Sequence, residues 1–128
     1  MIKLQGKILR FDSINNNGYI FPKNCKIDIP EKIPLLLDFD RETVIGICEV
    51  NRDSEGLTAK CVSHLEEVKT LLEQEKNGAG GYYNCVKFHN ENGVKVIDKC
   101  KLQYVSMTLE PADEHCSFGI VRENKEND

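Results

Sequence analysis

The segment from Ile33 to Val62 constrains the fold more than any other part of this chain. It begins with the apolar run IPLLL and continues into a charged corner, DFDR, at residues 38–41. Residues 44–51 and 56–62 then alternate between apolar and polar side chains, with the polar stretch RDSE between them. Such alternation predicts two strands, and the short polar link predicts a β-hairpin. The continuous apolarity of residues 35–37 predicts a buried strand before the corner.

One helix is predicted directly after this hairpin. Ser63 followed three residues later by Glu66 is a capping-box pattern, with Ser63 as the N-cap. Four apolar residues then recur at helical spacing: Leu65, Val68, Leu71 and Leu72. We expect the helix to run from about His64 to Lys76 and to end at the Asn-Gly pair that follows.

Six to eight short strands are expected in the whole chain. Besides those above, they are predicted at residues 2–12, 18–21, 82–89, 94–98, 101–109 and 117–122. Asn90–Gly93 is predicted to be a hairpin turn. Gly78–Gly81 follows a helix and precedes a strand, the reverse of the order in a phosphate-binding loop, so a flexible connection is predicted there.

The pattern as a whole predicts a mostly β fold, a β-barrel or curled antiparallel sheet carrying one main helix. We expect a single domain over residues 1–123, followed by a charged tail at residues 124–128 that is disordered at its end.

Charge and hydropathy exclude two classes of partner. The formal net charge is −4, and lysine and arginine are scattered among acids. A nucleic-acid-binding protein shows a basic face, so nucleic acid is not an expected partner. No apolar run approaches the roughly 20 residues that span a bilayer, so no membrane segment is expected. The first residues alternate and carry charge, unlike a signal peptide, so we expect a cytoplasmic protein.

The cysteines are predicted to be reduced. There are six, none in a C-x-x-C pair, and most stand in apolar, strand-like settings. Without a secretion signal, disulfides are not expected. Two close Cys/His pairs, Cys61 with His64 and His115 with Cys116, have no second half at zinc-site spacing. No metal and no other cofactor is therefore expected.

A series of motifs, in order along the chain, resembles the prohead proteases of tailed phages, which are related to the herpesvirus assemblins. The motifs are GYIFPKN, IPLLLDFDRETVIG, the hairpin with EGLTAKCV, the glycine-rich GAGGYY after the helix, and LQYVSMTLEPAD. The resemblance covers residues 5–122. It implies a prohead-protease-like α+β fold, and it places the family's reactive centre at three positions of this chain.

Those three positions lack the side chains that the family's chemistry needs. In the family, the apolar run ends in His-Asp, and this histidine is the general base. The matching residue here is Phe39, followed by the retained Asp40. The nucleophilic serine of the glycine-rich segment matches Gly80, and the third polar member matches Tyr104. Serine proteolysis requires a hydroxyl, a base within reach and a group that orients the base. The resemblance therefore implies a catalytically inactive relative with no catalytic residues.

Other side chains are not expected to replace them. All three histidines are predicted to be surface residues: His64, His89 and His115. Ser63 is assigned to the helix cap. Ser106 is predicted to be a satisfied core or edge hydroxyl. Cys61 and His64 could form a thiol–imidazole pair only by chance geometry. Tyr82 and Tyr83 are adjacent in a strand, so one is expected in the core and one at the surface, where it could mark an interface.

We expect a non-catalytic structural protein of a phage or prophage, bound to the major capsid protein or the scaffold. It would be a decoration or cement protein, or else an assembly factor, present as a homo-oligomer or bound to the capsid. Its locations would be the host cytoplasm during assembly and then the virion. Two alternatives stay open: an active maturation protease with a non-standard site, and an unrelated small β-barrel that binds a peptide or ligand. The edges near residues 2–12 and 117–122 are candidate pairing sites.

Overall fold

The computed structural model describes residues 1–74 and 76–121, and these form nine strands and one helix. The prediction of a mostly β fold with one helix is confirmed, with nine strands in place of six to eight. The elements are β1 (Ile2–Arg10), β2 (Tyr19–Ile20), β3 (Lys26–Asp28), β4 (Ile33–Leu37), β5 (Asp40–Arg52), β6 (Gly56–Ser63), α1 (Glu67–Glu73), β7 (Gly78–Glu91), β8 (Val94–Thr108) and β9 (Phe118–Ile120).

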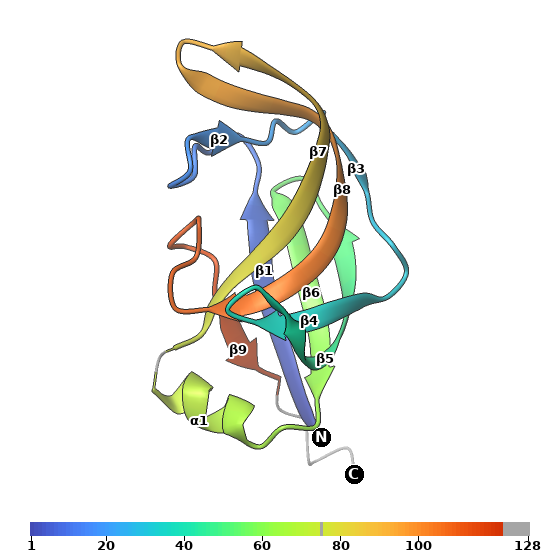
Figure 1. Cartoon of the computed structure of the whole chain (residues 1–128), viewed down its shortest axis with the longest axis vertical. Coiled ribbons are helices and arrows are strands. Elements are labelled where there is room, and N and C mark those ends of the chain that lie inside the picture. The colour runs from blue at the N-terminus through green and yellow to red at the C-terminus, as the bar shows by residue number, and fades with distance from the viewer. Residues whose placement is uncertain (75, 122–128) are drawn as a thin grey trace.

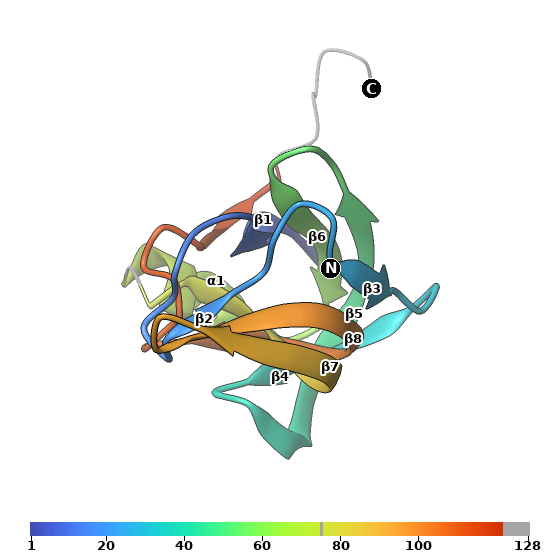
Figure 2. The same cartoon turned by 90° about the horizontal axis from the view of Figure 1, so that it is seen from above.

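All nine strands belong to one curled sheet, in which β8 pairs with more strands than any other. The strand order is β2–β8–β4–β5–β6–β1–β9, and β3 and β7 also pair with β8. One edge of β8 receives β2, β3 and β4 in succession, all parallel to it, and the other edge pairs antiparallel with β7. The remaining pairs are antiparallel. Curling of the sheet brings the β7–β8 hairpin opposite β1 and β6 (Figures 1 and 2).

One hydrophobic core fills the inside of the curl, and a bulge in β8 decides which residues enter it. Tyr82 pairs with Tyr104 but Tyr83 pairs with Leu102, so Gln103 is an extra residue in β8. The bulge shifts the alternation, so Val105 and Met107 face the core. Tyr104 and Ser106 consequently point to the outer face of the hairpin.

Both predicted hairpins are present. In the β5–β6 turn, the Asp53 carboxylate accepts hydrogen bonds from the N–H groups of Glu55 and Gly56 at 2.7 and 3.0 Å. In the β7–β8 turn, Asn92 and Gly93 have φ values of 51° and 80°, the two left-handed positions of a type I′ turn.

Two predictions for this hairpin are wrong. Gly78–Gly81 is not a flexible connection but the start of β7, paired with residues 105–108 of β8. Residues 94–98 and 101–109 are not two strands, because β8 continues through both. Cross-strand pairing along its whole length keeps the strand extended through the lysine-rich middle that suggested a break.

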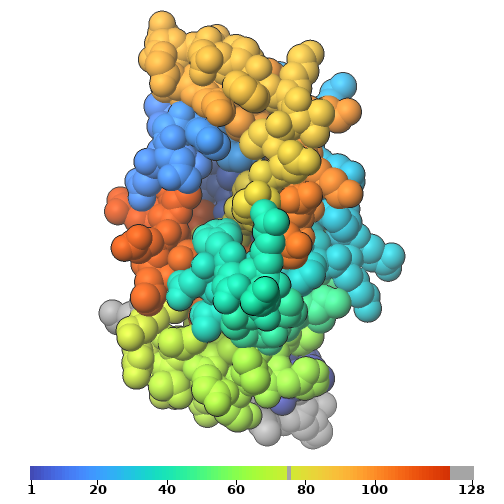
Figure 3. Space-filling model, in the orientation of Figure 1, coloured from blue at the N-terminus to red at the C-terminus, as the bar shows by residue number. Residues whose placement is uncertain are grey.

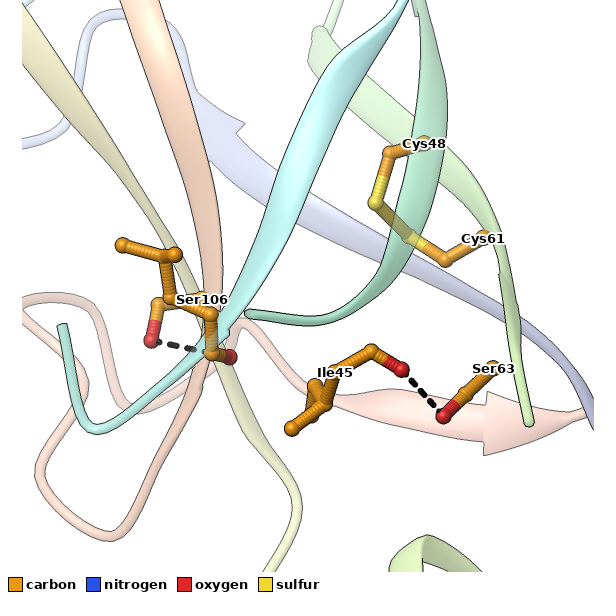
Figure 4. Close-up of a disulfide and its surroundings, with 6 residues drawn as sticks. Ile45, Cys48, Cys61, Ser63 and Ser106 are labelled. Carbon is orange, nitrogen blue, oxygen red and sulfur yellow. Dashed lines mark hydrogen bonds between the residues drawn. A yellow bond between two sulfur atoms is a disulfide. The ribbon is translucent and has the colours of Figure 1, made fainter. Parts of the chain in front are cut away.

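The helix is shorter than predicted, and its predicted cap is wrong. The N-cap is Glu66, which makes no side-chain cap hydrogen bond. Ser63 is the last residue of β6, paired with both Ile2 and Gly46, and its hydroxyl donates to the Ile45 carbonyl (Figure 4). Pairing within the sheet therefore overrides the local capping signal. No helix of the described residues has the length and apolarity that crossing a bilayer requires.

The apolar face of the helix is largely as predicted. Val68 is fully buried, and Leu71 and Leu72 pack against the core, whereas Leu65 lies before the helix and is exposed. Three predicted features lie partly or wholly outside the described residues: the helix at residue 75, the last strand at residue 122, and the tail at residues 124–128.

The prediction that every cysteine is reduced is wrong. Cys48 in β5 and Cys61 in β6 form a disulfide, with their Cα atoms 4.1 Å apart (Figure 4). The two residues are direct partners in the hairpin register, so folding brings their side chains together on one face. The other four cysteines are free: Cys25, Cys85, Cys100 and Cys116.

Candidate functional site

The corner at residues 38–41 is a two-residue hairpin in a demanding conformation. Leu37 pairs with Asp40, and the two residues between them, Asp38 and Phe39, have φ values of 50° and 58°. The left-handed conformation is rare for a bulky residue and costs about 1–2 kcal/mol. Hydrogen bonds to β8 hold the corner in this shape, because the Asp38 N–H donates to the Met107 carbonyl at 2.8 Å.

Ser106 supplies the second anchor and is fully buried beneath the corner. Its Oγ accepts a hydrogen bond from the Phe39 N–H at 2.9 Å. Its own proton is donated to the Met107 carbonyl at 3.1 Å, with the Leu36 carbonyl at 3.3 Å. The prediction of a satisfied hydroxyl is confirmed. Among the described residues, the hydrogen-bond partners of this oxygen are all backbone groups.

The three positions assigned to the reactive centre come together on the outer face of the β7–β8 hairpin. Phe39 lies over Gly80, since a Cβ added at Gly80 would stand 3.0 Å from the Phe39 Cζ. Gly80 pairs with Ser106, and Tyr104 lies two residues further along that face. The space between β7 and the corner is thus occupied by an aromatic ring, and none of the three side chains accepts a proton as a base does.

Charged side chains around the corner form hydrogen bonds and cation–π contacts with nearby residues. The Arg41 guanidinium lies 4.9 Å from the Tyr82 ring centroid and 5.9 Å from that of Tyr104, and it donates to the Tyr82 hydroxyl at 2.9 Å. The Asp40 carboxylate accepts from the Thr43 hydroxyl at 2.7 Å and from the Glu42 N–H, and these bonds lower its pKa. The Asp40 carboxylate is therefore hydrogen-bonded to residues of its own strand, β5.

All three histidines are exposed, as predicted. His89 lies nine residues along β7 from Gly80, roughly 30 Å for an extended strand. Its Nδ1 is 2.6 Å from an Asp98 carboxylate oxygen and its Nε2 is 3.3 Å from Glu91. The hydrogen bond to Asp98 is the main cause of a raised pKa at His89.

A cleft of about 790 Å³ opens beside the corner, and sequence reasoning did not predict it. We call it the β1–β7 cleft, because the end of β1 and the start of β7 form two of its walls. Figure 3 shows the hollow between the segments at residues 13–19, 79–85 and 110–114. Apolar and aromatic side chains line its interior: Ile8, Leu9, Tyr19, Phe21 and Tyr83. Phe39 and Tyr82 also line the cleft, on the side of the corner.

An ion pair joins two walls of the cleft. Arg10 of β1 donates two hydrogen bonds to the Asp113 carboxylate, at 2.5 and 3.0 Å. Burial acts to raise the pKa of Asp113, but the bonds from Arg10 and from the His115 N–H outweigh it, so the pKa lies below its ordinary value. This pair ties the loop at residues 110–114 to the sheet.

Tyr83 carries a polar group that the fold leaves unpaired. Its hydroxyl is buried and has no hydrogen-bond partner within the described part of the chain. It lies against Gly81, where an added Cβ would stand 2.6 Å from the oxygen. The ring packs against Phe21, with centroids 4.9 Å apart. Burial raises the pKa of Tyr83 well above its ordinary value. The prediction for the tyrosine pair is confirmed: Tyr83 packs inward and Tyr82 is exposed.

The lining of the cleft holds one thiol and no imidazole among the described residues. Its one cysteine, Cys85, has a pKa raised by burial, which disfavours the reactive thiolate. No histidine is among the described residues that line it. Across residues 1–74 and 76–121, no group of three or more His, Cys, Asp or Glu side chains is arranged to hold a metal ion.

Comparison with protein-family models, with curated proteins and with solved structures gives no match to this chain.

Proposed function

We propose that this chain is a non-catalytic structural protein of a phage or prophage, built on a prohead-protease-like fold and bound to the capsid. The observation that carries the proposal is the packing of Phe39 over Gly80. These residues match the family's base and nucleophile, and they lie against each other in this fold. A ring occupies the place where a base would have to reach a serine.

The way the corner is maintained supports a retained binding surface. A strained pair of left-handed residues persists only where the surrounding structure holds it. Here two hydrogen bonds to β8 do so, one to the Met107 carbonyl and one to the buried Ser106 hydroxyl. A decaying active site without a role would be expected to lose such a costly turn. We therefore propose that the shape is kept because a partner, the major capsid protein or the scaffold, contacts this side of the molecule.

Quantitative mass spectrometry of purified particles tests this function. A decoration role predicts that the chain is found in mature particles at a fixed ratio to the major capsid protein. An assembly role predicts that it is found in immature particles and lost from mature ones. Absence from both particle types, with the free protein abundant in the same lysate, would contradict the proposal.

A further inference from the structure

β7 offers a long free backbone edge. It pairs with β8 over its whole length. On its other side, backbone contacts within the described residues involve only its first two residues: Gly78 forms an isolated bridge with Ser117, and the Ala79 N–H donates to the Cys116 carbonyl. From Gly80 to Glu91, no backbone hydrogen bond joins β7 to any described strand or loop other than β8. Unpaired N–H and C=O groups along such an edge are a template for an added strand.

The β1–β7 cleft lies along the first half of this edge. Gly80, Gly81 and Cys85 line it together with the residues of β1. The space over the two glycines is filled within the chain, by the Phe39 ring over Gly80 and the Tyr83 hydroxyl over Gly81, so an added strand would approach β7 along its free edge. Alternate side chains of an added strand would meet the apolar interior around Leu9 and Phe21. Backbone pairing with apolar pockets at alternate positions is the usual way in which a sheet edge binds an extended peptide.

Charge at the mouth of the cleft selects the kind of peptide. Arg10 and Asp113 neutralise each other. Glu110 and Glu114 remain: both are exposed, and Glu110 has no ion-pair partner among the described residues. Glu114 lies 3.8 Å from His115, which is charged only when protonated. The mouth is therefore acidic, and it is bordered by the exposed ring of Tyr82. A lysine or arginine side chain complements the acidic charge, whereas the Tyr82 ring is already covered by Arg41.

We propose that the β1–β7 cleft binds an extended segment of a partner protein, which adds to β7 as a strand and places a lysine or arginine beside Glu110 and Glu114. The inference goes beyond a capsid role, because it requires only a partner with such a segment and holds for any assembly. It also assigns to β7 the pairing that the sequence suggested for the terminal strands.

The test uses the intact protein and fluorescein-labelled peptides of about seven residues, the length of a typical strand. The first peptide alternates valine and lysine. The second replaces lysine by glutamate, and the third keeps the first sequence but carries N-methyl groups at alternate residues, which removes one pairing edge. Fluorescence anisotropy is expected to show binding of the first peptide and at least tenfold weaker binding of the other two, a difference of about 1.4 kcal/mol or more.

Variants and amide mapping locate the site. The double variant Glu110→Gln/Glu114→Gln is expected to weaken binding of the valine–lysine peptide by on the order of tenfold. The matched control, Glu42→Gln/Glu49→Gln, removes two exposed glutamates of β5 outside the cleft and should leave affinity unchanged. In ¹H–¹⁵N spectra, the largest amide shifts are expected at residues 80–85 and 8–10.

Several results would overturn the inference. They are the failure of all three peptides to bind, equal binding of the glutamate or N-methylated peptide, and amide shifts centred on β9 or the β5–β6 hairpin. Equal weakening by the two glutamine double variants would also contradict it, because it would show a general effect of net charge.

Discussion

The corner and the β1–β7 cleft adjoin each other, but they differ in how fully their polar groups are hydrogen-bonded. At the corner, the backbone N–H groups of Asp38 and Phe39 and the hydroxyl of Ser106 all have partners, and a ring covers Gly80. In the cleft, a strand edge is unpaired and the Tyr83 hydroxyl has no partner in the described chain.

This difference indicates which of the two regions leaves groups unpaired that an added strand could engage. Buried polar groups that are already paired gain nothing from a ligand, whereas unpaired backbone and an open apolar surface do. The corner, which the family resemblance marks as the reactive centre, is therefore a closed structural unit. The cleft beside it, which the sequence analysis did not predict, is the open one.

The largest expected effect comes from opening the corner. Ser106→Ala removes the acceptor of the Phe39 N–H and leaves that group unpaired beneath the ring. We expect the free energy of unfolding to fall by about 1–3 kcal/mol. Urea denaturation followed by circular dichroism measures it. A change below about 0.5 kcal/mol would mean that the hydroxyl does not hold the corner.

A smaller effect is expected from the contact between Phe39 and Gly80. Gly80→Ala alone should give little gain or a loss, because the new Cβ would stand 3.0 Å from the ring. In a Phe39→Ala background, the same change should stabilise by about 0.5–1 kcal/mol, the usual benefit of alanine over glycine in a strand. A double-mutant cycle by urea denaturation should give a coupling of about 1 kcal/mol. Strict additivity would show that the ring does not cover Gly80.

Removing a hydroxyl from the cleft should not lower the free energy of unfolding, in contrast to removing the Ser106 hydroxyl. Tyr83→Phe removes a buried group that has no partner, so stability should stay level or rise by up to about 1 kcal/mol. Thermal and urea unfolding, run beside Ser106→Ala, compare the two regions directly. Destabilisation by more than about 1 kcal/mol would indicate that a water or another polar group pairs this hydroxyl.

The smallest effect concerns the ion pair in the cleft wall. The depressed pKa of Asp113 contributes stability above its ordinary value of 3.8, and this contribution is lost as pH falls through the lower folded-state value. NMR titration of the Asp113 carboxyl should therefore give a midpoint below 3.8. Arg10→Gln should raise that midpoint, because burial then acts without the compensating hydrogen bonds. An unchanged midpoint would show that Arg10 does not hold the loop.

Sequence periodicity predicted those parts of the fold that depend on near neighbours. The hairpin at Asp53 and the turn at Asn92–Gly93 follow from alternation and turn chemistry, and both are present. The helix was predicted to begin too early in the chain. Ser63 resembles an N-cap, but in the fold it pairs with two neighbouring strands as the last residue of β6. The Cys48–Cys61 disulfide follows from the register of the β5–β6 hairpin. The hairpin was predicted, but a disulfide was not, because the sequence shows no secretion signal.

The site depended on features that no local pattern contains. The Arg10–Asp113 pair joins residues 103 apart in sequence, so only the fold brings them together. Because of the bulge at Gln103, Tyr104 faces outward. No glycine, proline or asparagine near Gln103 in the sequence indicates this bulge. A phenylalanine at positive φ contradicts residue preference, and β8 supplies the bonds that hold it. The family resemblance assigns a reactive centre to three positions, and the fold brings two of these residues, Phe39 and Gly80, into contact.

The most direct test of the account is to incubate the purified protein with the major capsid protein encoded in the same genome. The account predicts a stable complex by size-exclusion chromatography, and intact capsid protein by mass spectrometry after prolonged incubation. Specific cleavage of the capsid protein that disappears in Ser106→Ala or Cys85→Ala would contradict it, because the chain would then be an active protease. Absence of both a complex and cleavage would contradict the capsid role.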